Sequence, residues 1–136
     1  MPPPDRQSGR EAAATVLVDA RNVLRSTWPN MREQEVVDGC RTWAKANGTR
    51  AVVVFDGSAP GGMRGERAID DHCVVVGTGS ESADAWIERA AAELRAQGYA
   101  YWLVTSDREL RAAAGSAAER TIGGGTFARV LRSLQK

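Results

Sequence analysis

Three apolar, β-branched runs that end in aspartate constrain the fold more than any other feature of this sequence. The runs are "VLVD" (16–19), "VVVFD" (52–56) and "WLVTSD" (102–107). The second run shows no alternation of polar and apolar residues, which is typical of a strand buried on both faces of a parallel sheet. Sites in such sheets form beyond the carboxyl ends of the strands. We therefore expect Asp19, Asp56 and Asp107 to lie at one edge of the sheet.

The rest of the chain alternates predicted strands with predicted helices. Further short strands are predicted over 73–77 and 119–124, and helices over 31–47, 80–98, 107–114 and 126–135. The predicted N-caps of the first two helices are Asn30 and Ser80, and Gly48 is predicted to end the first. The Gly-rich stretch 56–67 is predicted to be a loop. Strands that alternate with helices indicate βαβ units, and hence an α/β domain with a mainly parallel sheet of about five strands. Residues 14–136 are predicted to form this single domain, after a flexible tail over 1–13.

Charge and composition exclude several classes of protein. The 136 residues carry a net charge of +1, so no global field draws the chain to nucleic acid or to a membrane. No run approaches the roughly 18 apolar residues of a membrane span, and "MPPPDRQSGR" lacks the apolar centre of a secretory signal. Cys40 and Cys73 match no zinc-binding spacing and are predicted to lie in the core. These features predict a soluble, cytoplasmic protein.

A second group of acidic residues begins the helix predicted over 80–98. Glu81, Asp84 and Glu88 are spaced by three and four residues, so they share a helix face, and the first two fall in its first turn. Carboxylates that crowd together raise one another's pKa, and a bound cation relieves this repulsion. Their oxygens suit Mg²⁺ or Mn²⁺. Such ions activate water for phosphodiester hydrolysis, so the cluster predicts a metal-dependent hydrolase.

Each carboxylate also has a purely structural explanation. Asp19 can cap a turn, Asp56 begins a common Asp-Gly turn, and Asp107 can cap the helix that follows it. Glu81 and Asp84 are electrostatically favoured at a helix N-terminus without any metal. The metal-site hypothesis therefore depends on the coincidence of several such positions at one edge of the sheet.

The motifs "VLVDARNVL", "VVVFDG", "SESADAWIERAA" and "WLVTSDRELR" together resemble the NYN branch of the PIN-like nuclease fold, and within it the YacP-like group of ribonucleases. The resemblance extends over about 15–134. It implies a three-layer α/β/α sandwich and a metal-dependent endoribonuclease that hydrolyses single-stranded RNA with Mg²⁺ or Mn²⁺. By position it implies that the metal-binding carboxylates are Asp19, Asp84 and Asp107, that the residue orienting substrate or water is Asn22, and that the cluster is completed by Asp56 and Glu81.

The sequence departs from this group in two places. Ala20 and Arg21 stand where the group usually has Gly-Tyr, and Ser82 stands where it has Thr. Loss of the aromatic residue removes a surface on which a base could stack, although an arginine can stack or bind phosphate instead. The departures therefore affect the expected substrate preference more than the expected chemistry.

A nearly neutral protein must attract RNA locally, and arginines at the predicted edge are the candidates. Their planar forks bind phosphate without reading sequence. The candidates are Arg21, Arg25, Arg64, Arg67, Arg108 and Arg111. Glycines before the last helix ("GGGTF", 123–127) are consistent either with a phosphate site or with a turn capped by Thr126. Trp43, Trp86 and Trp102 are predicted to pack in the core, whereas Trp28 falls in a loop.

Two other classes of function are alternatives to a nuclease. One is a non-catalytic RNA- or ribosome-binding module on the same fold, which would bind mRNA or ribosome-associated RNA without cutting it. The other is a small-molecule α/β domain such as a phosphatase or a receiver. A receiver needs paired acids after its first strand and a lysine after its last, but Asp19 stands alone and the only internal lysine is Lys45. A homodimer is compatible with the sequence, although no residue demonstrates one.

Overall fold

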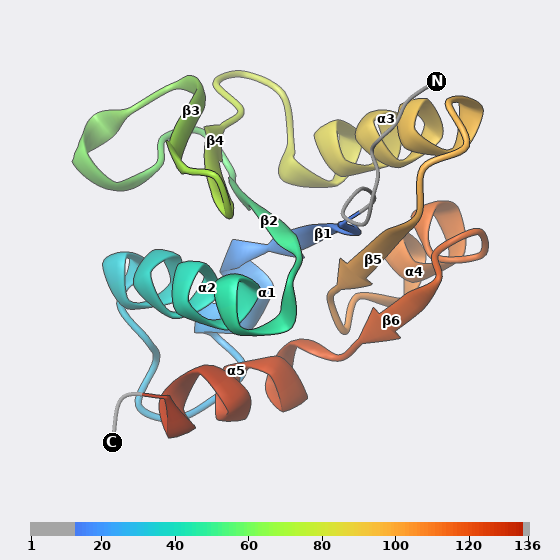
Figure 1. The fold of residues 1–136 in the computed structure, drawn as a ribbon. Coiled ribbons are helices and arrows are strands. Elements are labelled where there is room, and N and C mark those ends of the chain that lie inside the picture. Colours follow the sequence, from blue (N-terminus) through green and yellow to red (C-terminus); the bar gives the residue numbers. More distant parts are fainter. Residues whose placement is uncertain (1–12, 135–136) are drawn as a thin grey trace.

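The computed structural model describes residues 13–134, which form a sandwich around a six-stranded sheet (Figure 1). The strand order is β3-β4-β2-β1-β5-β6, and neighbouring strands are parallel except β3 and β4. The strands are β1 (Thr15–Asp19), β2 (Arg50–Phe55), β3 (Gly65–Asp70), β4 (Cys73–Gly77), β5 (Tyr101–Val104) and β6 (Arg120–Ile122). The helices are α1 (Ala20–Leu24), α2 (Glu33–Asn47), α3 (Ala83–Ala96), α4 (Arg108–Ala114) and α5 (Gly124–Ser133), with a 3-10 turn over Pro60–Gly62.

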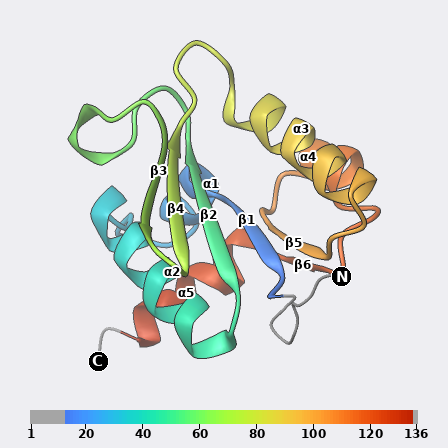
Figure 2. The same ribbon diagram turned by 45° about the horizontal axis from the view of Figure 1, so that its top comes forward.

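Helices cover both faces of the sheet, as the predicted α/β/α sandwich requires (Figure 2). Successive side chains of a strand point to opposite faces. Val16 and Val18 pack into the core under α1, α2 and α5, whereas Leu17 packs into the core under α3 and α4. None of the three is more than 1% exposed. The prediction of strands buried on both faces is therefore confirmed, and it explains why these runs show no polar alternation.

The register of the parallel strands places the ends of three of them at one edge. Asp19, the last residue of β1, pairs with Val54 of β2, and Val18 pairs with Val104 of β5. Asp56 and Asp107 follow their strands within three residues of these partners. The carboxyl edge of the sheet therefore gathers the aspartates that end the three apolar runs, as predicted.

Local capping explains where the two long helices begin and end. Gly48 ends α2 with a φ of 64°, the left-handed conformation predicted for this glycine. Ser82 caps α3 by accepting a hydrogen bond from the N–H of Ala85 at 3.1 Å. The predicted cap at Ser80 is wrong, because Thr78 makes its own turn with Glu81 before the helix begins. Ile87 then anchors α3 to the sheet, a burial that stabilises the fold by about 1.5–3 kcal/mol.

One strand, β3, and one helix, α1, were not predicted from the sequence. The stretch predicted as a loop over 56–67 ends in β3, which pairs antiparallel with β4 at the edge of the sheet. Its residues are mostly exposed and polar, so an apolar pattern cannot reveal it. The single turn of α1 follows β1 without a break and was also missed. The start predicted for the last helix is two residues late, since Gly123 and not Thr126 stands at the N-cap of α5.

Four other expectations concern the N-terminal tail, membrane spans, the two cysteines and the start of α2. The predicted flexible tail, 1–13, lies outside the described residues except for Ala13. No helix of residues 13–134 is long and apolar enough to cross a membrane. Cys40 and Cys73 are buried and unbridged, as predicted. Arg32, and not the predicted Asn30, occupies the N-cap position of α2.

Candidate active site

Four aspartates from different parts of the fold lie at the carboxyl edge of the sheet, where their negative charges repel one another. Asp19 ends β1, Asp56 follows β2, Asp84 lies in the first turn of α3, and Asp107 is the N-cap of α4. The charges of Asp84 and Asp56 act on Asp19, and those of Asp107 and Asp56 act on Asp84. Four of the five predicted acidic residues therefore lie at one edge, where their charges influence one another.

Asp19 is the most buried of these carboxylates, with 7% of its surface exposed. Burial raises its pKa above the ordinary value of 3.8, and the charges of Asp84 and Asp56 raise it further. Two hydrogen bonds act in the opposite direction: the Thr105 hydroxyl donates to Oδ2 at 3.0 Å, and the backbone of Asn22 also donates to the carboxylate. Asp19 is thus held in a fixed position in a site that disfavours its charged form.

Asp84 is half-buried, and the pKa of its carboxyl is also raised above 3.8. Partial burial is the main cause, followed by repulsion from Asp107 and Asp56 and then from Glu88 and Glu109. No lysine or arginine of residues 13–134 forms an ion pair with Asp19, Asp84 or Asp107. The negative charge of these three side chains is therefore not compensated within the part of the chain that the structure describes.

Asp56 and Asp107 both hold neighbouring backbone in place. Asp56 Oδ1 accepts the N–H of Ala83 at 2.7 Å, which ties the loop after β2 to the start of α3. Asp107 Oδ1 accepts the N–H groups of Glu109 at 2.9 Å and Leu110 at 3.1 Å, and so caps α4. The explanation of Asp107 as a helix cap is thus confirmed, whereas Asp56 binds the start of α3. The cap leaves Asp107 Oδ2 without a hydrogen-bond donor among the described residues.

Glu81 does not join the four aspartates. Glu81 was predicted to lie in the first turn of α3. This is wrong, because α3 begins at Ala83 and Glu81 precedes the helix. Its carboxylate forms an ion pair with Arg89, and this hydrogen bond lowers its pKa below the ordinary value of 4.5. Glu81 is not among the main charges that raise the pKa of Asp19 or Asp84. The described contacts of Glu81 therefore fit a surface ion pair better than a metal ligand.

Asn22 lies between the carboxylates and the start of α5. Its Oδ1 accepts the N–H of Ser106 at 2.9 Å, and the Ser106 hydroxyl in turn accepts the N–H of Gly124 at 2.8 Å. A Cβ atom at Gly124 would lie 2.0 Å from Asn22 Oδ1, so glycine is required there for the amide to fit. Three segments that are distant in sequence thus fix the orientation of the Asn22 side chain.

Sequence reasoning missed the organising role of Thr105 and Ser106. The buried Thr105 hydroxyl donates to Asp19 and accepts the N–H of Asp107 at 3.1 Å, so it links two of the carboxylates. Ser106 links Asn22 to α5. Both residues precede Asp107 directly in "TSD", and two small hydroxyl residues after a buried strand were the available signal.

The carboxylate oxygens at this edge are the type of ligand that a hard divalent cation prefers. They do not by themselves form a complete coordination cage. Within residues 13–134, no three His, Cys, Asp or Glu side chains are gathered closely enough to hold a metal ion by themselves. Mg²⁺ does not require such a cage: it commonly keeps several waters and takes one or two carboxylates together with substrate phosphates. The uncompensated carboxylates of Asp19, Asp84 and Asp107 meet that requirement.

The predicted RNA-binding arginines lie in different places. Arg21 is exposed at the carboxyl edge, with its Nε 3.8 Å from Asp56 Oδ2, and Arg108 begins α4 at the same edge. Arg64 lines a shallow hollow with Trp86 and Arg89. Arg67 lies within β3 opposite Val75, in the middle of the strand pair, and so is not at the predicted edge. The two remaining candidates are Arg25, which ends α1, and Arg111, which donates to Thr121.

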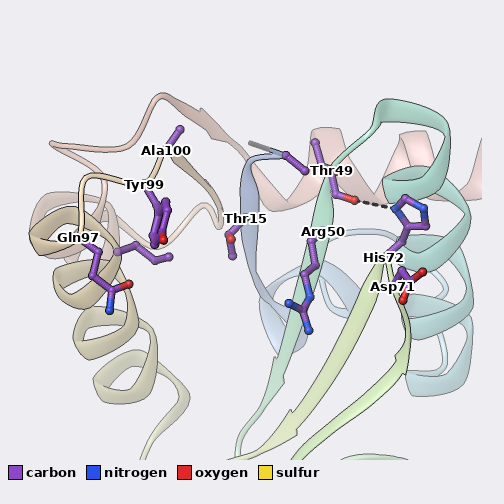
Figure 3. Close-up of a pocket in the computed structure, with 10 residues that line it drawn as sticks. Thr15, Thr49, Arg50, Asp71, His72, Gln97, Tyr99 and Ala100 are labelled. Atoms are coloured by element: carbon purple, nitrogen blue, oxygen red, sulfur yellow. Dashed lines mark hydrogen bonds between the residues drawn. The ribbon is translucent and has the colours of Figure 1, made fainter. Parts of the chain in front are cut away.

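A separate hollow of about 400 Å³ lies at the opposite edge of the sheet (Figure 3). Thr15 and Arg50, which begin β1 and β2, line it together with Tyr99 before β5. His72, the single histidine, lies on this side, with Nδ1 3.1 Å from the carbonyl oxygen of Thr49. No aspartate of the candidate site lines this hollow, so it is distinct from that site. His72 therefore lies outside the candidate site.

Comparison with known proteins agrees with this fold. The description "YacP-like NYN domain" belongs to a family profile that matches residues 16–135. Two solved structures of Rae1 (YacP) from Bacillus subtilis, one of them of a point mutant, share the fold. The mutant structure has a TM-score of 0.67 and 20% identity, covering 90% of this chain and 77% of that chain. The other has a TM-score of 0.62 and 21% identity, covering 89% and 75%. No curated protein sequence matches significantly. The chain belongs to the YacP-like NYN domain family.

Proposed function

We propose that this protein is an endoribonuclease that hydrolyses single-stranded RNA with Mg²⁺ or Mn²⁺ at the carboxyl edge of its sheet. The observation that carries the proposal is the pair Asp19 and Asp84. Asp19 is buried and Asp84 is half-buried, both have a raised pKa, and neither has a cationic partner in the described residues. The resemblance to the YacP-like ribonuclease group supports the choice of RNA as the substrate.

The ligands of the cation would be Asp19 and Asp84, with Oδ2 of Asp107 as the third candidate. Asp56 is a weaker candidate, because one of its oxygens binds the α3 backbone and the other lies near Arg21. A bound divalent ion supplies an activated water and stabilises the negative charge that develops on the phosphate. Asn22 is held where its amide can orient substrate, and the exposed Arg21 can bind an adjacent phosphate. The proposed substrates include mRNA and ribosome-associated RNA in the cytoplasm.

The direct test of this function is incubation of the purified protein with end-labelled RNA in Mg²⁺, in Mn²⁺ and in excess EDTA. We expect internal cleavage products in either metal and none in EDTA, with activity restored when metal is returned. Asp70→Asn is a suitable control, since Asp70 pairs with Arg41 on the surface. RNA binding without cleavage in any metal would indicate the non-catalytic module instead.

Thr105→Val is expected to move the acidic limb of the activity profile to higher pH. The Thr105 hydroxyl lowers the pKa of Asp19 by donating to its carboxylate, so valine raises this pKa further. A larger fraction of Asp19 is then protonated in mildly acidic buffer, and metal binding requires the ionised form. The pH dependence of cleavage at saturating Mn²⁺ measures the shift. Thr49→Val, another buried threonine at the opposite edge, is the matched control.

A further inference from the structure

Two segments of the chain carry several arginines and no acidic residue of their own. The segments 20–32 and 124–133 contain five arginines and no Asp or Glu, in a chain whose net charge is only +1. The arginines are Arg21, Arg25, Arg32, Arg129 and Arg132. The two segments lie together, because α1 packs against α5 and the chain that follows α1 passes beside α5 (Figure 1). We call Arg25, Trp28, Arg129 and Arg132 the basic face.

The basic face begins next to the candidate active site. The start of α5 is tied to Asn22 through Gly124 and Ser106. The next residue, Gly125, has the guanidinium of Arg129 over it: a Cβ there would lie 3.6 Å from Arg129 Nη1. One turn further along α5, Arg132 donates to the carbonyl oxygen of Pro29, the neighbour of Trp28. Positive groups therefore extend along α5 from Asn22 to the loop that carries Trp28.

Trp28 differs from every other tryptophan in the chain. Its side chain is 89% exposed, whereas Trp43 is 8% exposed and packs edge-to-face against Trp102 and Phe127. The Arg132 contact to Pro29 restrains the loop next to it. A large aromatic surface in water is unfavourable unless a ligand covers it, and bases stack on such surfaces without sequence preference.

We propose that the basic face holds the single-stranded RNA beyond the cleaved bond, with a base stacked on Trp28 and phosphates bound by Arg25 and Arg129. This inference rests on the proposed function. Charge complementarity favours RNA over a protein partner, because none of Arg25, Arg129 and Arg132 forms an ion pair within the described residues. The face also compensates for the missing aromatic residue at position 21, where stacking next to the metal site is lost.

The test measures binding of oligouridines of roughly 4 and roughly 16 nucleotides, the two ends of the site sizes known for single-strand binding domains. Binding is measured in EDTA, so that no cleavage occurs. Trp28→Ala is expected to weaken binding of the longer oligonucleotide about 10-fold and to leave the shorter one unchanged. Arg129→Gln is expected to reduce the slope of log K against log salt by about 0.7 for the longer one, which corresponds to one lost phosphate contact.

Two matched controls lie at the opposite edge of the sheet. Tyr99→Ala removes another exposed aromatic residue, and Arg50→Gln another exposed arginine; neither is expected to change RNA binding. Trp28→Phe should restore most of the affinity, because it restores a stacking surface. Equal loss for both oligonucleotides, or for the Tyr99 control, would overturn the proposal. So would a change from dimer to monomer in Trp28→Ala by light scattering, since it would assign Trp28 to contact with a second copy.

Failure of this inference and failure of the proposed function give different results. If the wild-type protein cleaves RNA and Trp28→Ala binds the longer oligonucleotide as well as wild type does, the basic face is not the RNA path although the nuclease remains. If the wild-type protein neither binds nor cleaves RNA, the proposed function itself is wrong.

Discussion

Asp19→Asn is expected to abolish metal-stimulated RNA cleavage and, at the same time, to make the metal-free protein more stable at neutral pH. The loss of activity should be on the order of 10³-fold, as when one preorganised electrostatic group is removed from a transition state. Asparagine keeps the size of the side chain and an oxygen that can accept from the Thr105 hydroxyl. The fold should therefore survive.

The gain in stability follows from the raised pKa of Asp19. Burial makes the folded protein hold this proton to a higher pH than the unfolded chain, whose carboxyl has the ordinary pKa of 3.8. Between the two pKa values the folded state binds more protons, so the free energy of unfolding falls as pH rises through this window. Above it, the ionised carboxylate destabilises the folded state. Asparagine has no such charge, and we expect a gain on the order of 1 kcal/mol.

Urea denaturation of both proteins in EDTA, at pH 7 and at pH 4, measures this effect. The difference in unfolding free energy should be larger at pH 7, and it should shrink or reverse when Mn²⁺ is added, because only wild type gains binding energy from the ion. Asp70→Asn should behave oppositely, since Arg41 and the N–H of His72 lower the pKa of Asp70. A folded Asp19→Asn protein that still cleaves RNA at the wild-type rate would contradict the assignment.

Gly124→Ala is the substitution outside the carboxylates with the largest expected effect on activity. The new methyl group would lie 2.0 Å from Asn22 Oδ1 and 2.9 Å from Ser26 Oγ, so the amide must leave its position. The hydrogen bond from the Ser106 N–H is then lost. Because a displacement of about 1 Å in a positioning group costs about 10²-fold in rate, we expect a loss of that size. Overpacking should also destabilise the fold by about 1–3 kcal/mol.

Gly125→Ala provides a control at the next residue of the same helix. A Cβ atom there makes only ordinary contacts, the nearest at 3.6 Å from Arg129 Nη1. Alanine favours the helix over glycine by up to about 1 kcal/mol, so this variant should be as stable as wild type or more so, and active. Steady-state cleavage measures the activity of both variants, and thermal unfolding measures their stability. Equal activity of the two alanine variants would show that the position of Asn22 does not matter for cleavage.

The layered fold could be predicted because its cause is local. Unbroken apolar runs such as 52–55 need a helix layer on each side, and the position of Asp19 at the end of such a run follows from the sequence directly. The strand β3 could not be predicted in this way, because its exposed residues at the edge of the sheet, such as Glu66 and Arg67, carry no apolar alternation. An edge strand of this kind is defined by its hydrogen bonds to a neighbouring strand, and local sequence patterns do not reveal that pairing.

The candidate site was predicted less completely than the fold, for the same reason. Asp19, Asp84 and Asp107 could be placed at one edge from strand ends and helix starts. Whether Glu81 joins them depends on which serine caps α3 and on the position of Arg89, eight residues further on. The link that Thr105 makes between two carboxylates depends on the pairing of β1 with β5. This pairing brings Asp19 next to Thr105, which is 86 residues away in the sequence.

The most direct test of the account is titration of Mn²⁺ into the RNA-free protein by calorimetry, with wild type beside Asp84→Asn and Glu88→Gln. Glu88 lies one turn further along α3 and is exposed, so it is the matched control. We predict saturable binding to wild type and to Glu88→Gln, and at least a 10-fold weaker affinity in Asp84→Asn. Equal affinity in all three proteins, or no binding to wild type, would contradict the claim that the aspartates at the carboxyl edge form a metal site.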